Sequence, residues 1–510
     1  MIEKKHALLP LLSFVSLQGM AQSQRPNVIL IVADDLGYAD ISCYGAKGVK
    51  TPAVDRLAKR GIRFTDAHCV ASTSTPSRYG LLTGCYPFRK ANTNVAAGNA
   101  GMIISPNQFT LADLFREQGY KTGAIGKWHL GLGSKTAGQN WNEPLDEHLA
   151  DIGFDYSYIM AATADRVPCV FIENGRVANY DPSAPIEVSY QKAFQDVRSY
   201  QDYKTEELKL PSSHGHNYSV VNGIGRIGWM KGGGQALWQD ENIADSITSH
   251  ALTFIDQHQH EPFFLYLATN DVHVPRYPHD RFRGKSPMGL RGDAILQFDW
   301  TIQCVTEQLD KLGLTDNTLI ILTSDNGPVL DDGYQDRAIE LAEEAGHRPG
   351  GDFRGGKYSA FEAGSTIPFI VSWPGHIKKG KESRSLVSQI DIMGSLARLI
   401  GGQIPEGQGI DTRDHLDTWL GKSKQDAPFA VSMAASRSLT LRTKEWKYIA
   451  PFNGEPVISW GPAIETGYLN APQLYHYKKD PAETRNVADQ HPDIVSRMQE
   501  TLAKVREKAK

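Results

Sequence analysis

A short segment beginning at Ser74 places a candidate nucleophile at the start of a predicted helix. Residues 74–84 read Ser-Thr-Pro-Ser-Arg-Tyr-Gly-Leu-Leu-Thr-Gly. Pro76 suits a first helical turn, because its φ is fixed near the helical value and its missing N–H would have no partner there. Free N–H groups and the positive end of the helix dipole then face an anion attached at Ser74, and Arg78 lies about one turn further along the same face. The segment favours an anionic ester as ligand, and a serine-capped surface helix with a solvated arginine is the simpler alternative.

Oxygen-bearing side chains follow two predicted strands. Residues 27–33 and 318–323 are short apolar runs, and the first is aliphatic on both faces, as in a central parallel strand. The side chains that follow these runs are Asp34, Asp35, Asp325 and Asn326. Ligands of open α/β sheets bind at the carboxyl ends of the strands, and four oxygen donors suit calcium or magnesium better than zinc. The pattern predicts a hard-cation site, with a solvated turn at the paired aspartates as the alternative.

Basic and imidazole side chains occupy comparable positions elsewhere in the chain. The predicted strands at residues 121–125 and 262–269 each lead into a segment with a histidine, and a lysine precedes the predicted strand at residues 367–373. The side chains in question are Lys127, His129, His273 and Lys357. A lysine or histidine at any one of these places is readily structural or solvated, so the functional interpretation depends on the whole set.

The segment at Ser74 resembles the signature of the type I sulfatases of the alkaline phosphatase superfamily. In that signature a Cys or Ser followed by x-Pro-Ser-Arg and a later Thr-Gly is recognised by a maturase, which oxidises the first residue to formylglycine. The matching residues are Ser74, Pro76, Ser77, Arg78, Thr83 and Gly84, with Ser in place of the commoner Cys. Residues 51–64 and 126–131 are also similar to family segments, and the resemblance covers nearly the whole chain after residue 21.

The resemblance implies a metal site, a modified residue and a set of catalytic side chains. The implied ligands of a Ca²⁺ or Mg²⁺ ion are Asp34, Asp35, Ser74, Asp325 and Asn326. The implied catalytic residues are Ser74, modified to formylglycine, with Arg78, Lys127, His129, His273 and Lys357. By this correspondence Lys127 and His129 contact the formylglycine and the sulfate, Lys357 binds sulfate oxygens, and His273 protonates the leaving alcohol. A maturase that accepts serine is then a required partner.

Elementary chemistry explains why the modification is useful. An unmodified serine could attack sulfur, but water would then have to attack sulfur again. One hydroxyl of a formylglycine hydrate can attack sulfur while the alcohol leaves, and deprotonation of the other hydroxyl re-forms the carbonyl and expels sulfate by breaking a carbon–oxygen bond. A metal would polarise the sulfate, and each preorganised cationic side chain would contribute roughly a few kcal/mol.

The order of the predicted elements indicates the fold class. With 40% hydrophobic and 22% charged residues, the 510-residue chain has a normal globular balance but is too long for one ordinary domain. Repeated strand–helix alternation predicts an α/β fold with a large mixed, mostly parallel sheet sandwiched by helices. Strands near residues 438–442, 446–449 and 473–477, followed by a helix from Pro492, predict a smaller C-terminal α+β subdomain with an antiparallel sheet. We expect a signal peptide at residues 1–21, a catalytic domain at 22–424 and this subdomain at 425–510.

The N-terminus and the charge indicate location and partners. Lys4 and Lys5, an apolar run and small residues ending at Ala21 are typical of a cleavable secretory signal, so we expect a periplasmic or secreted protein. The net charge of −4 gives no reason to expect nucleic acid, and no later apolar run has the length of a membrane span. The five cysteines lack zinc-site spacing and are expected as free thiols, with one disulfide left open.

A long polar stretch from about residue 133 to residue 261 lacks a clear sheet pattern, and we expect specificity to be built there. Within it, Asp165 and Arg166 pair an acceptor with a planar donor fork, which suits vicinal sugar hydroxyls; an internal salt bridge is an equal alternative. His214 and His216 have a metal-like spacing without an evident carboxylate partner, so we interpret them as a pocket wall or a surface turn.

These features resemble carbohydrate sulfatases of glycan-degrading bacteria and predict an exo-acting 6-O-sulfatase on galactose or N-acetylgalactosamine, with a sulfated glycan as partner. Other sulfated sugars and aryl sulfates stay open. Two other classes compete. A phosphomonoesterase or phosphodiesterase of the same superfamily would use two zinc ions and need further ligands, whereas Gly327 and Pro328 follow Asn326. A non-catalytic glycan-binding homologue would be expected to have lost part of the motif.

Overall fold

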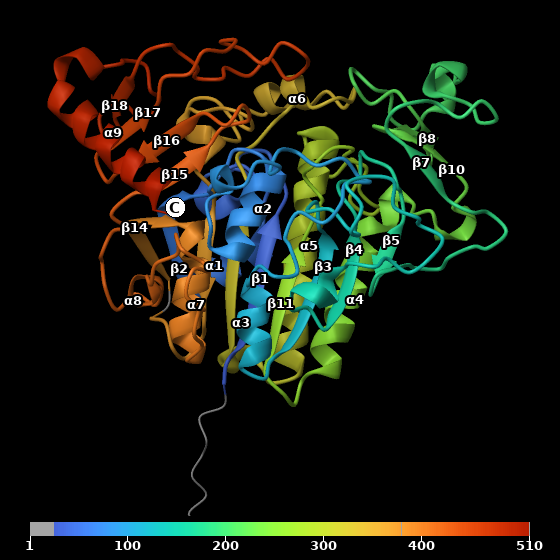
Figure 1. Ribbon diagram of the computed structural model, residues 1–510, viewed down its shortest axis with the longest axis horizontal. Coiled ribbons are helices and arrows are strands. Elements are labelled where there is room, and N and C mark those ends of the chain that lie inside the picture. Colours follow the sequence, from blue (N-terminus) through green and yellow to red (C-terminus); the bar gives the residue numbers. More distant parts are fainter. Residues whose placement is uncertain (1–24, 379, 509–510) are drawn as a thin grey trace, which may run out of the picture.

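The computed structural model describes residues 25–378 and 380–508, and a mixed sheet of ten strands runs through the centre of this part of the chain (Figure 1). Across the sheet the order is β14 (Lys381–Ser388), β2 (Gly61–His68), β13 (Phe369–Ser372), β12 (Thr318–Ser324), β1 (Asn27–Ala33), β11 (Phe263–Ala268), β3 (Lys121–Lys127), β4 (Tyr156–Met160), β5 (Phe171–Glu173) and β6 (Arg176–Val177). The five neighbouring strands β12, β1, β11, β3 and β4 are mutually parallel, whereas β13 is antiparallel to both of its neighbours.

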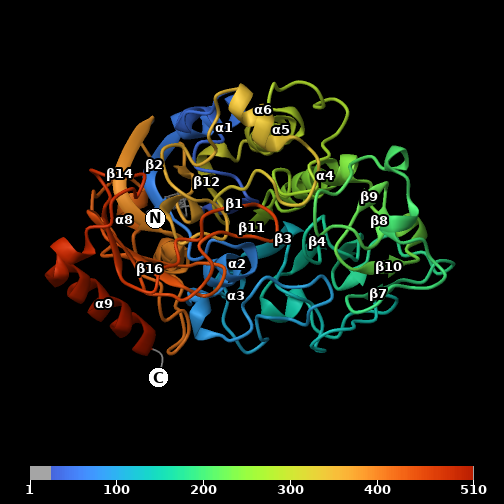
Figure 2. The same ribbon diagram turned by 90° about the horizontal axis from the view of Figure 1, so that it is seen from above.

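Helices cover both faces of this sheet, which explains the apolar sequences of its central strands. All seven residues of β1 are buried, and the strand pairs in parallel register with β12 and β11. One face carries α2 (Ser74–Thr83), α3 (Leu111–Glu117) and α7 (Ile392–Ile400), and the other carries α1 (Pro52–Lys59), α4 (Ile243–Gln257) and α5 (Gly289–Lys311) (Figure 1 and Figure 2). A parallel strand with helices on both sides has no solvated face, so both of its faces must be apolar. The predicted fold class is confirmed.

A second, antiparallel sheet of four strands lies beside the first, at the upper left of Figure 1. Its strands, in spatial order, are β15 (Ala430–Met433), β16 (Leu439–Arg442), β17 (Trp446–Ile449) and β18 (Gln473–His476). Helix α9 (Pro492–Glu507) packs against it through Val495, Met498, Leu502 and Val505. The predicted C-terminal sheet and helix are thus observed, together with β15, which was not predicted. The division between residues 424 and 425 stays a prediction.

The polar stretch from residue 133 to residue 261 contains more sheet than its sequence indicates. Strands β4, β5 and β6 extend the main sheet, although the sequence of this stretch shows no clear sheet pattern. Two small antiparallel strand pairs lie beyond this edge, β7 (Glu187–Ser189) with β10 (Trp229–Lys231) and the hairpin of β8 (Val220–Val221) with β9 (Ile224–Gly225) (Figure 2). Strands this short carry too few residues for a periodic pattern.

The ends of two helices show how well the sequence predicts boundaries. Thr51-Pro52 and the stop at Gly61 predict a helix that runs to Arg60, and helix α1 ends at Lys59 with Arg60 as its cap. Gly61 begins β2, where a Cβ would lie 2.1 Å from the carbonyl oxygen of Val371 on β13. Asp293 is typical of a helix cap and predicts a helix that starts there, but helix α5 begins at Gly289, four residues earlier. The Asp293 carboxylate instead accepts hydrogen bonds from the backbone of the preceding loop, from Gly284, Lys285 and Ser286. Short helices α6 (Ala338–Glu344) and α8 (Leu416–Trp419) complete the helices of the described residues.

The predicted signal peptide lies outside the described residues. In the described part of the chain, no helix has the length and apolar character needed to span a bilayer. The described residues include all five cysteines, and each is a free thiol.

Candidate active site

Ser74 is the first residue of α2, as its sequence predicts. Thr73 precedes the helix with extended backbone, Pro76 lies in the first turn, and Gly84 ends the helix with φ of 64°. Every residue of α2 is buried, so the side chain of Ser74 faces protein and not bulk water. Ser77 and Thr83 point elsewhere: the Ser77 hydroxyl donates to Gln389 at 3.4 Å and that of Thr83 to the backbone of Tyr79 at 2.7 Å.

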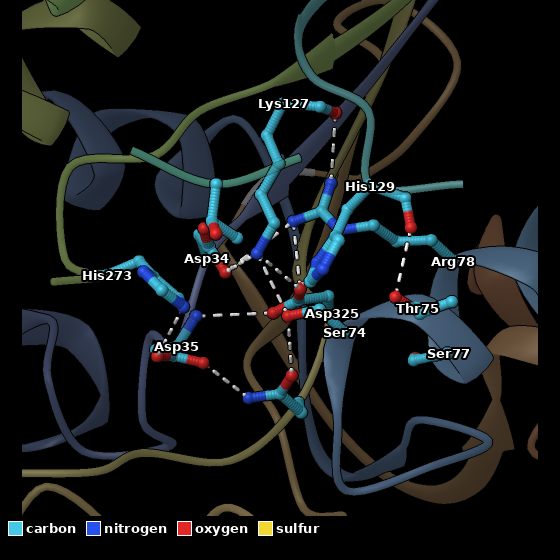
Figure 3. A network of polar contacts seen from close by, with 12 residues as sticks. Asp34, Asp35, Ser74, Thr75, Ser77, Arg78, Lys127, His129, His273 and Asp325 are labelled. Atoms are coloured by element: carbon cyan, nitrogen blue, oxygen red, sulfur yellow. Dashed lines mark hydrogen bonds and ion pairs between the residues drawn. The ribbon is translucent and has the colours of Figure 1, made fainter. Parts of the chain in front are cut away.

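The ends of four neighbouring strands bring the polar residues of the sequence together around Ser74 (Figure 3). Asp34 and Asp35 leave β1, Asp325 and Asn326 leave β12, Lys127 ends β3, and His273 follows β11. Asp35 has a left-handed φ of 56°, which turns the chain as it leaves the sheet. Adjacent strand residues would otherwise point to opposite faces, so this turn lets both aspartates approach one site.

Hydrogen bonds join these side chains into one buried network. The Lys127 ammonium donates to Asp34 at 2.6 Å and to the Ser74 hydroxyl at 2.9 Å, and this hydroxyl donates to Asn326 at 3.3 Å. Arg78 donates two hydrogen bonds to one oxygen of Asp325, at 2.8 and 3.0 Å. The candidate nucleophile is therefore held between a cation and an amide, beside three carboxylates.

The electrostatics of the network reflect its dehydration. Burial raises the pKa of Asp34 well above its ordinary value, with help from the charges of Asp325 and Asp35. Burial also lowers the pKa of Lys127. Although burial opposes it, Arg78 holds the pKa of Asp325 below its usual range. The cluster is too rich in carboxylates for its local cations to stabilise all of them fully.

This donor set fits a metal ion. Atoms of Asp34, Asp35 and His273 lie within 4.8 Å of one another, and the second carboxylate oxygen of Asp34 is buried without a hydrogen-bond partner. Leaving such an oxygen unpaired costs about 1–3 kcal/mol, more when it is charged. A cation bound there would supply the missing partner and offset the repulsion among the carboxylates.

Each of the two histidines has one ring nitrogen engaged and the other free of a close hydrogen-bond partner. Nε2 of His129 lies 3.0 Å from the carbonyl oxygen of Ala96, and Nδ1 of His273 lies 2.6 Å from that of Val274. A carbonyl only accepts, so these nitrogens carry the proton, and Nδ1 of His129 and Nε2 of His273 hold lone pairs. Burial and nearby cations keep the pKa of each histidine well below its usual value of 6.5.

Lys357 reaches the site from a loop and has a partner that sequence reasoning missed. Its ammonium donates to Asp35 at 2.8 Å and to Asp332 at 2.9 Å, and Tyr358 donates to the same Asp332 carboxylate at 3.0 Å. Asp332 is buried between them. Lys357 and Asp332 are 25 positions apart in the sequence, with loop and a short helix between them, so no local pattern could have indicated the contact.

A pocket opens from Ser74 toward the predicted sugar-binding pair. Arg166 donates to both carboxylate oxygens of Asp165, at 2.9 and 3.0 Å, and His216 lies 2.8 Å from one of them. Asp165 and Arg166 therefore form an internal salt bridge and also line the pocket, and His216 forms part of the pocket wall. The pocket is lined by Ser74, Val95, His129, Asp165, Arg166, His216, Ile227, His273, Asp332, Lys357, Tyr358 and Trp460.

Comparisons with known proteins identify the family of this chain. The sulfatase family model matches residues 26–402. A curated N-acetylgalactosamine-6-O-sulfatase of Bacteroides thetaiotaomicron is 51% identical over 484 residues, which cover 95% of this chain and 94% of the relative. Human steryl-sulfatase is 30% identical over 442 residues, covering 79% of this chain and 71% of the relative.

Solved structures share the fold of this chain over nearly its whole length. A structure described under the metabolism of multiple glycosaminoglycans by Bacteroides thetaiotaomicron has a TM-score of 0.92 at 51% identity, and covers 95% of this chain and 100% of that one. The structure of Ps i-CgsB with k-i-k-neocarrahexaose has a TM-score of 0.68 at 26% identity, covering 96% and 94%. The chain belongs to the sulfatase family and is a sulfuric ester hydrolase.

Proposed function

We propose that this protein removes the 6-O-sulfate group from terminal N-acetylgalactosamine or galactose residues of glycans. The observation that carries the proposal is the placement of Ser74 between Lys127 and Asn326, beside the carboxylates of Asp34, Asp35 and Asp325. The relative with 51% identity, an N-acetylgalactosamine-6-O-sulfatase, supports the choice of sugar and position. A two-zinc phosphoesterase is not favoured, because Gly327 and Pro328 stand where further metal ligands would be needed.

The sulfatase family is known for a formylglycine and a metal ion. In our proposal Ser74 becomes the formylglycine, and Asp34, Asp35, Asp325 and Asn326 hold the metal, with Ca²⁺ preferred over Mg²⁺ because the donors are oxygens on an irregular set of loops. When present, the formylglycine hydrate supplies the hydroxyl that attacks sulfur, and the metal polarises the sulfate. A maturase that accepts serine is the implied partner.

The side chains of this chain would then have distinct tasks. Nδ1 of His129 holds a free lone pair in the pocket and is suited to take a proton from the residue at position 74. Nε2 of His273 is suited to carry a proton to the departing sugar oxygen once a bound anion has raised its pKa. Lys127, Lys357 and Arg78 are positioned to offset the charge of the sulfate.

The formal charge of the site supports a monoanionic substrate. A bound metal would favour the ionised form of Asp34, whose pKa is raised by burial. The site then holds four carboxylates, Asp34, Asp35, Asp325 and Asp332, and three cations, Arg78, Lys127 and Lys357, so the side chains alone carry a formal charge of −1. A divalent cation makes it positive by one, which matches the single charge of a sulfate monoester.

Recognition of the sugar is assigned to Asp165 and Arg166, with His216 as their support. The three side chains line the same pocket as Ser74, and the carboxylate and guanidinium can exchange hydrogen bonds with two neighbouring hydroxyls. The basic and apolar N-terminal sequence supports export to the periplasm or the exterior.

A panel of sulfated sugars tests the proposal. Protein purified from its native host is expected to release sulfate from N-acetylgalactosamine 6-sulfate or galactose 6-sulfate, and much less from the 4-sulfated isomers. Arg166→Lys is expected to raise KM about tenfold or more, because a lysine cannot reproduce the planar fork. Preferential release from the 4-sulfated sugars would contradict the assignment.

A further inference from the structure

The rim of the active-site pocket carries an exposed aromatic ring from the far end of the chain. Trp460 lies between β17 and β18 and lines the pocket together with residues of the catalytic network. It is 58% exposed, the most of any large hydrophobic side chain among the described residues. Val95, also in the lining, is 43% exposed. Exposed apolar groups beside a polar pocket are a common mark of a ligand surface.

Trp460 is held in place by a hydrogen-bonded hairpin. The backbone N–H of Ile458 donates to Ile464 at 2.8 Å and that of Thr466 donates to Pro456 at 2.9 Å, which closes the turn that carries the ring. At the neighbouring Gly461 a Cβ would lie 2.0 Å from Nε2 of His214, so the absence of a side chain there allows the close approach. The ring therefore has a defined position at the rim.

The hairpin is attached to the loop that supplies Lys357. Arg354 forms an ion pair with Glu465 at 2.6 Å, and the backbone N–H of Ala360 donates to Thr466 at 2.8 Å. The Trp460 ring meets Tyr358 edge to face at 5.3 Å between centroids. These contacts fix the distance between the aromatic ring and the reacting end of the pocket.

The pocket is small compared with an oligosaccharide. Its cavity volume is about 60 Å³, which is room for a handful of ordered waters at roughly 10–15 Å³ each. The buried side chains of the lining are polar and suit the sulfate and hydroxyl groups, whereas its two exposed hydrophobic side chains are Val95 and Trp460. The C–H face of a second pyranose ring is the part of a glycan that an indole face would bind in preference to water.

We propose that Trp460, assisted by Val95, is a stacking platform for the sugar linked to the sulfated residue. The inference rests on the proposed carbohydrate sulfatase function and adds a subsite to it. The protein would then act more efficiently on sulfated oligosaccharides than on the sulfated monosaccharide, and the C-terminal subdomain would contribute directly to substrate choice.

The test compares two substrates in four proteins. The substrates are N-acetylgalactosamine 6-sulfate and a disaccharide that carries this residue at its non-reducing end. The proteins are the wild type, Trp460→Ala, Trp460→Phe and the control Val457→Ala, which changes a 38% exposed residue of the same hairpin outside the pocket lining. We expect the disaccharide-to-monosaccharide ratio of kcat/KM to fall about tenfold in Trp460→Ala. Trp460→Phe should retain most of the ratio, and Val457→Ala all of it.

The two proposals fail in different ways. The stacking platform would be overturned if Trp460→Ala kept the wild-type disaccharide-to-monosaccharide ratio of kcat/KM, including the case in which kcat/KM fell equally on both substrates. Either result would leave the sulfatase function intact. If the wild-type protein, with its modification verified, released no sulfate from either compound, the proposed substrate and the platform would both be wrong.

Discussion

At the scale of single residues, the backbone positions His129, the proton acceptor that we propose. It has a left-handed φ of 60°, an uncommon and strained conformation for a residue with a side chain, and the Ala96 carbonyl fixes its tautomer. Burial, with Lys127 and Arg166 nearby, keeps its pKa low, so the acceptor nitrogen is free at neutral pH.

Replacement of His129 by alanine should lower kcat by about 10²–10⁴-fold, the usual contribution of a general base. Steady-state kinetics on the preferred 6-sulfated sugar measure the effect, with His258→Ala at the surface end of α4 as the matched control. A kcat within tenfold of the wild-type value would rule out proton transfer by His129.

The excess of carboxylates predicts a strong response to metal removal. A chelator should abolish sulfate release, and Ca²⁺ should restore it. The chelator should also lower the melting temperature, because a metal that binds only the folded state stabilises that state by mass action. Asp34→Asn should reduce that thermal shift, whereas the exposed Asp352→Asn should leave it unchanged. Equal melting temperatures with and without chelator in the wild type would contradict a metal site here.

Site residues that follow apolar strands could be predicted from the sequence, whereas the loop residue Lys357 gained a role only through the family resemblance and other loop residues were missed. Asp34, Asp325 and His273 stand at the ends of readable strands. Asp332 and Trp460 belong to irregular segments, and their partners are distant in the chain. Nothing in local composition indicates which loop residues the fold will bring to the pocket.

At the scale of elements, the contact between β2 and β13 depends on Gly61. A methyl group there would lie 2.1 Å from the Val371 carbonyl, within the strand pair itself. We expect Gly61→Ala to destabilise the protein by roughly 1–3 kcal/mol, the usual cost of overpacking. Chemical denaturation measures this, with the exposed Lys59→Ala at the end of α1 as control. A free energy of unfolding within about 0.5 kcal/mol of wild type would show that the strands separate without cost.

The elements that could be predicted are the ones with enough residues to show a period or an apolar run. Strands β1, β12 and β11 appear as expected, and so does helix α3, which the cap Thr110 and the stop at Gly119 predict for residues 111–118. The start of α5 was misplaced because an aspartate that satisfies a loop has the same sequence signal as one that caps a helix.

At the scale of the whole molecule, a buried charged network joins the catalytic body to the C-terminal subdomain. Glu362 accepts hydrogen bonds from Lys447 on β17 at 2.9 Å and from Arg442 on β16 at 3.2 Å. Glu483 accepts one from the backbone of Glu362 at 2.6 Å. Burial, reinforced by the negative charge of Glu362, raises the pKa of Glu483 from 4.5 to about 8.

This raised pKa predicts that stability falls as pH rises. Between the unfolded value of 4.5 and the folded value of about 8, Glu483 keeps its proton in the folded state and loses it on unfolding. The folded state thus binds more protons, and Glu483 lowers the free energy of unfolding with increasing pH by up to about 1.4 kcal/mol per pH unit.

Glu483→Gln should remove this dependence, because the amide resembles the protonated acid. Unfolding free energies of wild type and variant should be similar near pH 5 and should diverge toward pH 8, where the variant is the more stable. Glu455→Gln, at an exposed site of the same subdomain, is the control. Parallel stability curves for wild type and Glu483→Gln would mean that Glu483 does not titrate in this range.

The central claim is that Ser74 becomes the reacting group. Digestion of the protein from its native host with trypsin yields a peptide of residues 64–78, between Arg63 and the cut after Arg78. Its mass should be lower than that of the unmodified sequence by two hydrogen atoms, in a preparation that releases sulfate from a 6-sulfated sugar. An unmodified Ser74 throughout an active preparation would contradict the formylglycine mechanism.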